Sequence, residues 1–192
     1  MNQDHILFKN HTALYAEFLS FEQKITALAT EMALILADYA IDHIACRVNN
    51  CKSAENYLTV LVKCGKILSQ NVINGRPIYL IELEQPLRFA GQSVAIVELP
   101  FPKNKIYPQE GWEHIEVVMP MRINESTIEW EARIFRQFGW NQSTHLRVKV
   151  DEPKGDGERL PNPSIAVSLT DKTKNHTCIK IHPYHIKEII EV

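Results

Sequence analysis

The strongest constraint on the fold is a short sequence that occurs twice. Asp42-His43-Ile44-Ala45-Cys46-Arg47-Val48 returns in altered form as Glu113-His114-Ile115-Glu116-Val117-Val118-Met119, and each copy begins with an acidic residue, a histidine and an isoleucine. Alternation along a strand places His43, Ala45 and Arg47 on one face of the first copy, and His114, Glu116 and Val118 on one face of the second. Each copy therefore predicts a strand whose polar face carries a histidine and whose other face packs into a core.

The repeat extends beyond these two strands. After each one, apolar residues recur at helical spacing up to a glycine, Gly65 or Gly139, and three further strands follow. Asn74-Gly75 is a strong hairpin signal between two strands of the first unit. We therefore expect an α+β fold in which two βαβββ units form a curved mixed sheet around a cleft. The expected elements are strands 41–48, 66–73, 76–83 and 92–99 with helix 52–64, then strands 112–119, 144–150, 164–169 and 177–182 with helix 125–138 and a final helix 184–191.

The remaining segments divide the chain into four parts. Residues 1–40 form an N-terminal helical segment, in which Ser20 and Gln23 suggest a capping box and hence two helices. Residues 41–99 are the first unit, 100–111 a linker with three prolines, and 112–192 the second unit with its C-terminal helix. Residues 152–163, rich in Gly, Pro and charge, are expected to be a loop that borders a binding site.

Composition limits the possible partners and the location. The 192 residues are 45% hydrophobic, enough to bury a core without disulfides. The 21 basic and 23 acidic residues include no basic run, which argues against nucleic acid as a partner. Residues 1–7 lack the basic and apolar stretches of a secretory leader and the longest apolar run, 32–37, is too short to cross a membrane, so we expect a soluble protein that is not exported. Its four cysteines form no C-x-x-C pair, so we expect reduced thiols in a cytoplasmic protein.

Four side chains on the polar faces form a candidate metal site. Alternation turns His43 and His114 the same way, together with Glu98 and His182 from the last strand of each unit. Imidazoles and a carboxylate suit Zn²⁺, Fe²⁺, Mn²⁺, Co²⁺ or Ni²⁺, and two histidines with one carboxylate form the facial set of non-haem iron oxygenases. Such an ion can hold vicinal oxygens of a substrate and stabilise an enediolate. Nearby candidates are Glu116 as base or alternative ligand, Arg47 as anion clamp and, more weakly, Glu82 for substrate binding.

Three other interpretations stand beside the metal site. The histidines can be structural residues that gene duplication copied, and Arg47 can pair with Glu116 as a structural bridge. The same cleft can bind an anionic small molecule without metal, through the histidines and Arg47. The N-terminal helices can instead serve as an interaction module. Stoichiometric metal that is lost on mutating His114 would separate the metal site from the metal-free binding cleft.

Longer motifs carry a family resemblance that covers most of the chain. The motifs are Asp42-His43-Ile44, Ile96-Val97-Glu98-Leu99-Pro100, Glu110-Gly111-Trp112-Glu113-His114-Ile115-Glu116, Glu158-Arg159-Leu160-Pro161-Asn162-Pro163 and His182-Pro183. Through them the chain resembles the bacterial YecM family, within the vicinal oxygen chelate superfamily of glyoxalase I and extradiol dioxygenases.

The resemblance implies a site and a class of chemistry. It implies paired βαβββ units, a divalent metal on His43, Glu98, His114 and His182, and isomerase, lyase or dioxygenase chemistry on a small-molecule substrate. Glyoxalase-like members carry glutamate where this chain has His182, which argues against a glyoxalase reaction. Superfamily members pair their units within one chain or between two, so the resemblance is compatible with a monomer or a homodimer.

Overall fold

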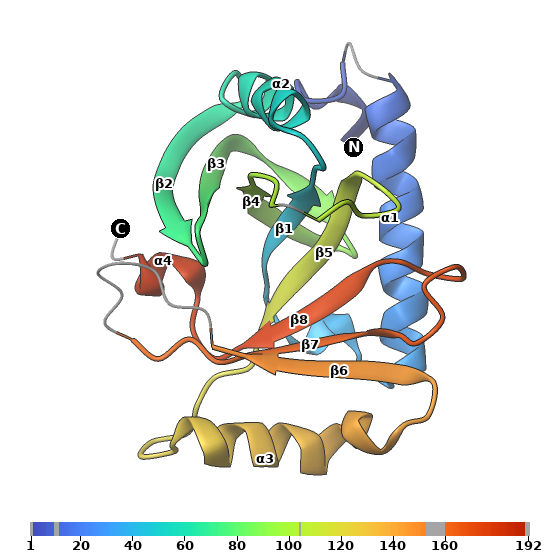
Figure 1. Ribbon diagram of the computed structural model, residues 1–192, viewed down its shortest axis with the longest axis vertical. Helices are drawn as coiled ribbons and strands as arrows, with labels where there is room; N and C mark the ends of the chain where they lie inside the picture. Colours follow the sequence, from blue (N-terminus) through green and yellow to red (C-terminus); the bar gives the residue numbers. More distant parts are fainter. Residues whose placement is uncertain (1, 10–11, 104, 153–159, 191–192) are drawn as a thin grey trace.

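The two repeated units lie side by side in one eight-stranded sheet of the computed structural model (Figure 1). The structure describes residues 2–9, 12–103, 105–152 and 160–190. The first unit consists of β1 (Ile41–Arg47), α2 (Cys51–Leu61), β2 (Gly65–Ile73), β3 (Arg76–Phe89) and β4 (Gln92–Pro100). The second consists of β5 (Gly111–Val118), α3 (Thr127–Phe138), β6 (Leu146–Asp151), β7 (Ser164–Leu169) and β8 (Cys178–His182). The chain also contains α1 (Thr12–Glu31), α4 (Ile186–Ile189) and the 3₁₀ turns Asn2–Asp4, Leu36–Asp38 and Trp140–Gln142.

The strand order shows the pseudo-symmetry of the repeat. The order is β2-β3-β4-β1-β5-β8-β7-β6. Reading inward from either edge therefore meets the second, third, fourth and first strand of one unit. Within each unit the first strand is parallel to the last, β1 to β4 and β5 to β8, and the remaining neighbours are antiparallel. The units join through the antiparallel pair β1 and β5. The expected α+β fold with a mixed sheet is confirmed, and the units pair within one chain.

The N-terminal segment differs from the expectation of two helices. Thr12–Glu31 is one continuous α-helix that runs through Ser20. Its buried residues Phe18, Phe21, Ile25 and Leu28 form one stripe, so packing along the whole helix outweighs any local capping at Ser20. Figure 1 shows α1 lying along one side of the sheet.

The main core lies between α1 and the apolar face of the sheet. The Phe18 ring meets the Trp112 ring edge-on at 5.1 Å and the Phe89 ring at 5.6 Å. Ile44 on β1 and Ile115 on β5 are fully buried in the same cluster. Burying an apolar side chain of this size stabilises the fold by about 1.5–3 kcal/mol. Because this face is filled by α1, the opposite face with its histidines is left to form the cleft.

A smaller cluster closes one end of the cleft. Ile186 and Ile189 of α4 pack on Leu80 of β3 and Ile96 of β4. The backbone N–H of Ile186 donates to Asp42 Oδ2 at 3.1 Å, which ties the start of α4 to β1. The C-terminal turn therefore buries this end of the polar face.

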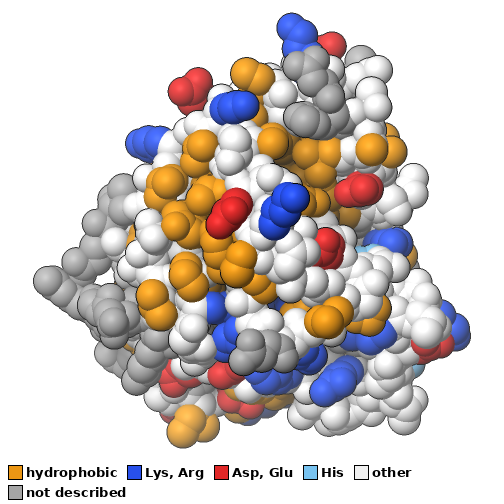
Figure 2. All heavy atoms as spheres, turned by 45° about the horizontal axis from the view of Figure 1, so that its top comes forward, with side chains coloured by type: hydrophobic (Ala, Val, Ile, Leu, Met, Phe, Trp, Pro, Cys, Tyr) orange, Lys and Arg blue, Asp and Glu red, His pale blue; other side chains and the backbone are white. Residues whose placement is uncertain are grey.

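The remaining features concern the surface and the cysteines. No helix in the described part of the chain is long and apolar enough to cross a membrane. All four cysteines are unpaired, and three of them are buried, while the cytoplasmic location stays a prediction. Figure 2 shows one face of the molecule, where hydrophobic side chains gather in the middle among charged side chains of both signs.

Candidate metal centre

A β-bulge sets the orientation of the first histidine. In the pairing of β1 with β5, Ile41 lies opposite Val117 and His43 opposite Glu116, so Asp42 is an extra residue in β1. A bulge turns two successive side chains toward the same face, which strict alternation does not allow. As a result Asp42 and His43 both lie on the polar face of the sheet, buried beneath the cleft, and His43 Nδ1 lies 2.8 Å from Asp42 Oδ2.

The second unit repeats this arrangement. Ala45 lies opposite His114 and Cys46 opposite Trp112, which leaves Glu113 as an extra residue in β5. The Glu113 carboxylate is hydrogen-bonded to His114 Nδ1. A carboxylate on Nδ1 sets the tautomer and ring orientation of an imidazole and leaves Nε2 free to bind a metal. The Nε2 atoms of both histidines are buried and have no hydrogen-bond partner among the described residues.

The Nε2 atoms of His43 and His114 both lie near the carboxylates of Glu98 and Glu116. His43 Nε2 lies 3.7 Å from both Glu98 and Glu116, and His114 Nε2 lies 3.7 Å from Glu98 and 3.4 Å from Glu116. Ligand atoms of His43, His114 and Glu116 all lie within 4.8 Å of one another. Atoms that each sit about 2.1 Å from one ion are separated by roughly 3.0–3.4 Å in octahedral or tetrahedral geometry. The separations of 3.4 and 3.7 Å between Glu116 and the two imidazole nitrogens are at or slightly above that range, so small side-chain movements would suffice to hold a divalent ion.

The register of the last strands corrects one equivalence in the repeat. His43 lies opposite Ile96, and His114 lies opposite Cys178. Two residues further along, Glu98 in β4 therefore corresponds to Lys180 in β8, and not to His182. Lys180 Nζ donates to Glu116 Oε1 at 2.7 Å. A cation thus occupies the position at which exact repeat symmetry would supply another carboxylate.

His182 is buried behind Glu116 and lies outside the three-residue group. Its Nδ1 is 3.5 Å from Glu116 Oε2 and its Nε2 is 3.4 Å from Asp42 Oδ2. The His182 ring meets the His43 ring edge-on at 5.9 Å. This arrangement supports a role for His182 in positioning Glu116, and its predicted role as a metal ligand stays a prediction.

The electrostatics of the site favour a cation. Burial alone would lower the pKa of His43, but the charge of Glu116 and the hydrogen bond with Asp42 raise it well above its ordinary value. Burial would raise the pKa of Glu98, but neighbouring His43 and Lys180 hold it at about 2. Burial lowers the pKa of His182. The carboxylates thus stay charged at neutral pH and attract positive charge into the site.

The predicted substrate-binding residues lie in different places. Arg47 lines the cleft, but its ion pair is with Glu113, at 2.8 Å, and its guanidinium lies 3.9 Å from the centroid of the Tyr107 ring. The predicted bridge from Arg47 to Glu116 is therefore wrong. Glu82 is not part of the cleft lining and pairs instead with Lys66 and Lys187.

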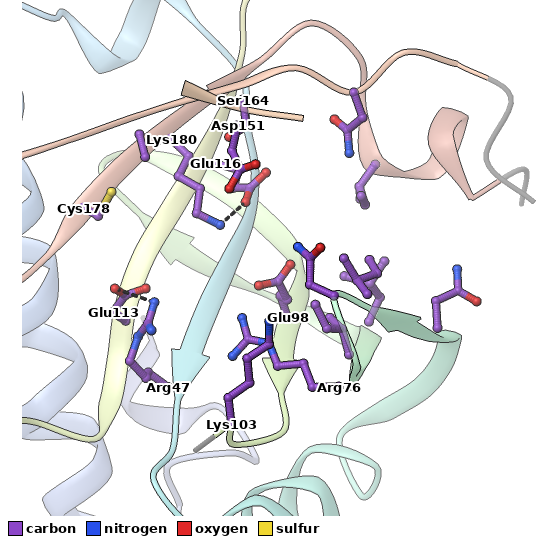
Figure 3. Close-up of a pocket in the computed structure, with 18 of the residues that line it drawn as sticks. Arg47, Arg76, Glu98, Lys103, Glu113, Glu116, Asp151, Ser164, Cys178 and Lys180 are labelled. Atoms are coloured by element: carbon purple, nitrogen blue, oxygen red, sulfur yellow. Dashed lines mark hydrogen bonds and ion pairs between the residues drawn. The ribbon is translucent and has the colours of Figure 1, made fainter. Parts of the chain in front are cut away.

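The cleft above the histidines has a volume of about 390 Å³. Its lining combines Glu98, Glu116 and Lys180 with side chains from β2, β3, β6 and β7 (Figure 3). Residues 153–159 of the predicted border loop lie outside the described residues, but Asn162, from the same loop, lines the cleft. A volume in this range suits a small metabolite.

Comparison with known proteins assigns the chain to a family. The sequence model described as "YecM protein" matches residues 10–192. The chain belongs to the YecM family. It is 60% identical over 184 residues to an uncharacterized protein of Haemophilus influenzae, covering 96% of this chain and 95% of that one. It is also 39% identical over 170 residues to "Protein YecM" of Escherichia coli K12, covering 88% and 87%.

A solved structure agrees with this family assignment. The structure titled "Structural Genomics, Protein EC4020" superposes with a TM-score of 0.79 at 34% identity, covering 94% of this chain and 91% of that one. The predicted YecM resemblance is confirmed. The paired βαβββ architecture that the vicinal oxygen chelate superfamily implied is the architecture observed.

Sequence patterns missed three residues of the site. Asp42 and Glu113 were noted only as the acidic residues that open each repeat, although each orients a histidine. Their identical position before the two histidines was a signal for that role. Lys180 was not singled out, although alternation puts it on the same face of β8 as His182; it lines the cleft and pairs with Glu116.

Proposed function

We propose that this protein binds a divalent metal ion in the manner of the vicinal oxygen chelate superfamily and acts on a small oxygen-rich metabolite as an isomerase or oxygenase. One observation carries the proposal. Two repeat-related histidines, each oriented by the preceding carboxylate, direct free and buried Nε2 atoms toward Glu116 and Glu98.

The donor set supports a metal of the borderline class. His43, His114 and Glu116 would hold the ion, and they form the two-histidine, one-carboxylate set that suits Fe²⁺, Zn²⁺, Mn²⁺, Co²⁺ or Ni²⁺. An unpartnered buried nitrogen costs stability unless a ligand satisfies it, and here two such atoms face the same point. Bound there, the ion would polarise neighbouring oxygens of a substrate.

The two carboxylates are suited to different roles. Glu116 is tied to Lys180 and lies against His182, so its position is well determined. Glu98 also faces the cleft, but no lysine or arginine among the described residues holds it in an ion pair. We therefore assign the ligand role to Glu116 and proton transfer at the substrate to Glu98, the reverse of the roles that the strand pattern suggested.

A second candidate function rests on the ion pairs within the cleft. Lys180 on Glu116 and Arg47 on Glu113 already neutralise two of the carboxylates without a metal. This observation favours a metal-free cleft that binds an anionic small molecule. Metal content decides between the two candidates.

The test measures metal by mass spectrometry in protein purified without a histidine tag and incubated with iron, zinc, manganese or nickel. We expect near-stoichiometric metal in the wild type and a loss of at least tenfold in His43→Ala, His114→Ala and Glu116→Gln. His145→Ala is the matched control, because His145 is exposed and remote from the cleft. Glu98→Gln should keep its metal. A wild type that stays empty with every ion would refute the metal proposal in favour of the metal-free one.

A further inference from the structure

Two cations in the cleft have no carboxylate partner among the residues that the structure describes. The lining contains five cationic side chains and four carboxylates. Three of the cations are committed to ion pairs: Arg47 with Glu113, Lys149 with Asp151, and Lys180 with Glu116. Arg76 and Lys103 form no ion pair with any residue that the structure describes. They are therefore available to an anionic ligand.

Strand pairing brings Arg76 and Lys103 to the same part of the cleft. Arg76 begins β3, directly after the tight turn at Asn74 and Gly75, where both residues have positive φ. Lys103 follows β4, and the N–H of Phe101 donates to the carbonyl of Pro77 at 2.8 Å. Because that bond holds the start of β3 beside the residues after β4, the two side chains emerge close together. Figure 3 shows both of their cationic ends directed toward Glu98.

We infer that Arg76 and Lys103 form a subsite for an anionic group, a phosphate or a carboxylate, at the far end of the substrate. The inference rests on the proposed function, because the substrate's vicinal oxygens would bind the metal ion while its anionic group binds Arg76 and Lys103. Arg presents a planar fork of donors that matches phosphate and carboxylate oxygens, and Lys adds a point charge. The substrate class is thus a small anionic metabolite with vicinal oxygens at one end.

The subsite also explains the distribution of charge in the lining. Lys180 and Arg47 lie beside the histidines and are held by the glutamates of β5. Arg76 lies at the start of β3 and Lys103 in the segment after β4, and Lys103 is exposed to solvent. A ligand anchored on them would lie across Glu98, the carboxylate to which we assign proton transfer.

The test compares two pairs of probes by titration calorimetry on the metal-loaded protein. Glycerate and 3-phosphoglycerate differ in a phosphate, and lactate and malate differ in a second carboxylate. We expect the probe with the additional anionic group to bind at least tenfold more tightly than its singly charged partner in at least one pair. The pair that shows the difference identifies the anion as phosphate or carboxylate.

Variants assign the effect to these residues. Arg76→Gln and Lys103→Gln should each reduce the advantage of the probe with the additional anionic group at least fivefold and leave metal content unchanged. Arg136→Gln on α3 and Lys63→Gln after α2 are the matched controls, because both residues are exposed and outside the cleft lining. Thermal melting of each variant shows whether it folds.

The outcomes separate this inference from the proposed function. Equal affinity within both pairs on metal-loaded protein, or no binding by any probe, would overturn the anion subsite while leaving the metal proposal intact. If both variants retain the tighter binding of the probe with the additional anionic group, the assignment to Arg76 and Lys103 is overturned. An empty wild type refutes the metal proposal and, with it, the two-ended substrate.

Discussion

Asp42→Asn tests whether the bulge residues orient the histidines. Asp42 is buried, and its Oδ2 lies 2.8 Å from His43 Nδ1 and accepts from the Ile186 N–H at 3.1 Å. Asparagine can keep an oxygen at this position but has no charge, so it holds the imidazole in its metal-binding orientation less strongly. Loss of such a partner weakens metal binding typically by about 10–100-fold. At about 1.4 kcal/mol per tenfold, the expected loss is roughly 1.4–2.8 kcal/mol of binding free energy.

The same substitution should cost a smaller amount of folding stability. Charge-assisted hydrogen bonds become neutral ones, a change of about 1–2 kcal/mol. For a chain of this size that lowers Tm by about 2–8 °C. Calorimetric titration with Zn²⁺ and Mn²⁺ gives the affinity, and thermal melting gives Tm.

A control substitution and the equivalent substitution in the second unit complete this test. Asp38→Asn removes an exposed aspartate just before β1 and should change neither quantity. Glu113→Gln should weaken metal binding by a similar factor, because Glu113 holds His114 as Asp42 holds His43. Metal affinity of Asp42→Asn within twofold of the wild type would refute the orienting role.

Three further predictions concern Lys180, Gly65 and Glu125. Lys180→Met should tighten metal binding about tenfold, because it removes a cation 2.7 Å from Glu116. Calorimetric titration measures the affinity, with Lys149→Met as the control. Weaker metal binding by Lys180→Met would contradict this prediction. Gly65→Ala should lower the unfolding free energy in urea by about 1–3 kcal/mol or more, because a Cβ would lie 2.0 Å from the Glu82 carbonyl oxygen; an unchanged midpoint would count against it. Arg133 holds the pKa of Glu125 at about 2, down from 4.5. The charged Glu125 carboxylate therefore contributes its full folding stability above pH 4.5, and this contribution is lost as pH falls toward 2. Glu125→Gln should be less stable than the wild type at pH 7, and a gap that does not narrow below pH 4.5 would argue against the ion pair.

Much of the fold and part of the site followed from local patterns. Repeat, strand alternation and the Asn74-Gly75 turn predicted both βαβββ units, because side-chain period and turn chemistry are properties of neighbouring residues. Those patterns also turned His43, Glu98 and His114 toward one face, where the structure brings them together. The single α1 helix was missed, because packing against the whole sheet decides its length.

Pairing between strands decided the rest of the site. The sequence determined that two histidine-bearing strands exist and that each histidine follows an acidic residue. The tertiary structure decided that Asp42 and Glu113 bulge, that Lys180 rather than His182 corresponds to Glu98, and that Glu116 completes the group with the histidines. Bulge and register depend on which residue of one strand meets which residue of another, and periodicity within a single strand carries no information about that match.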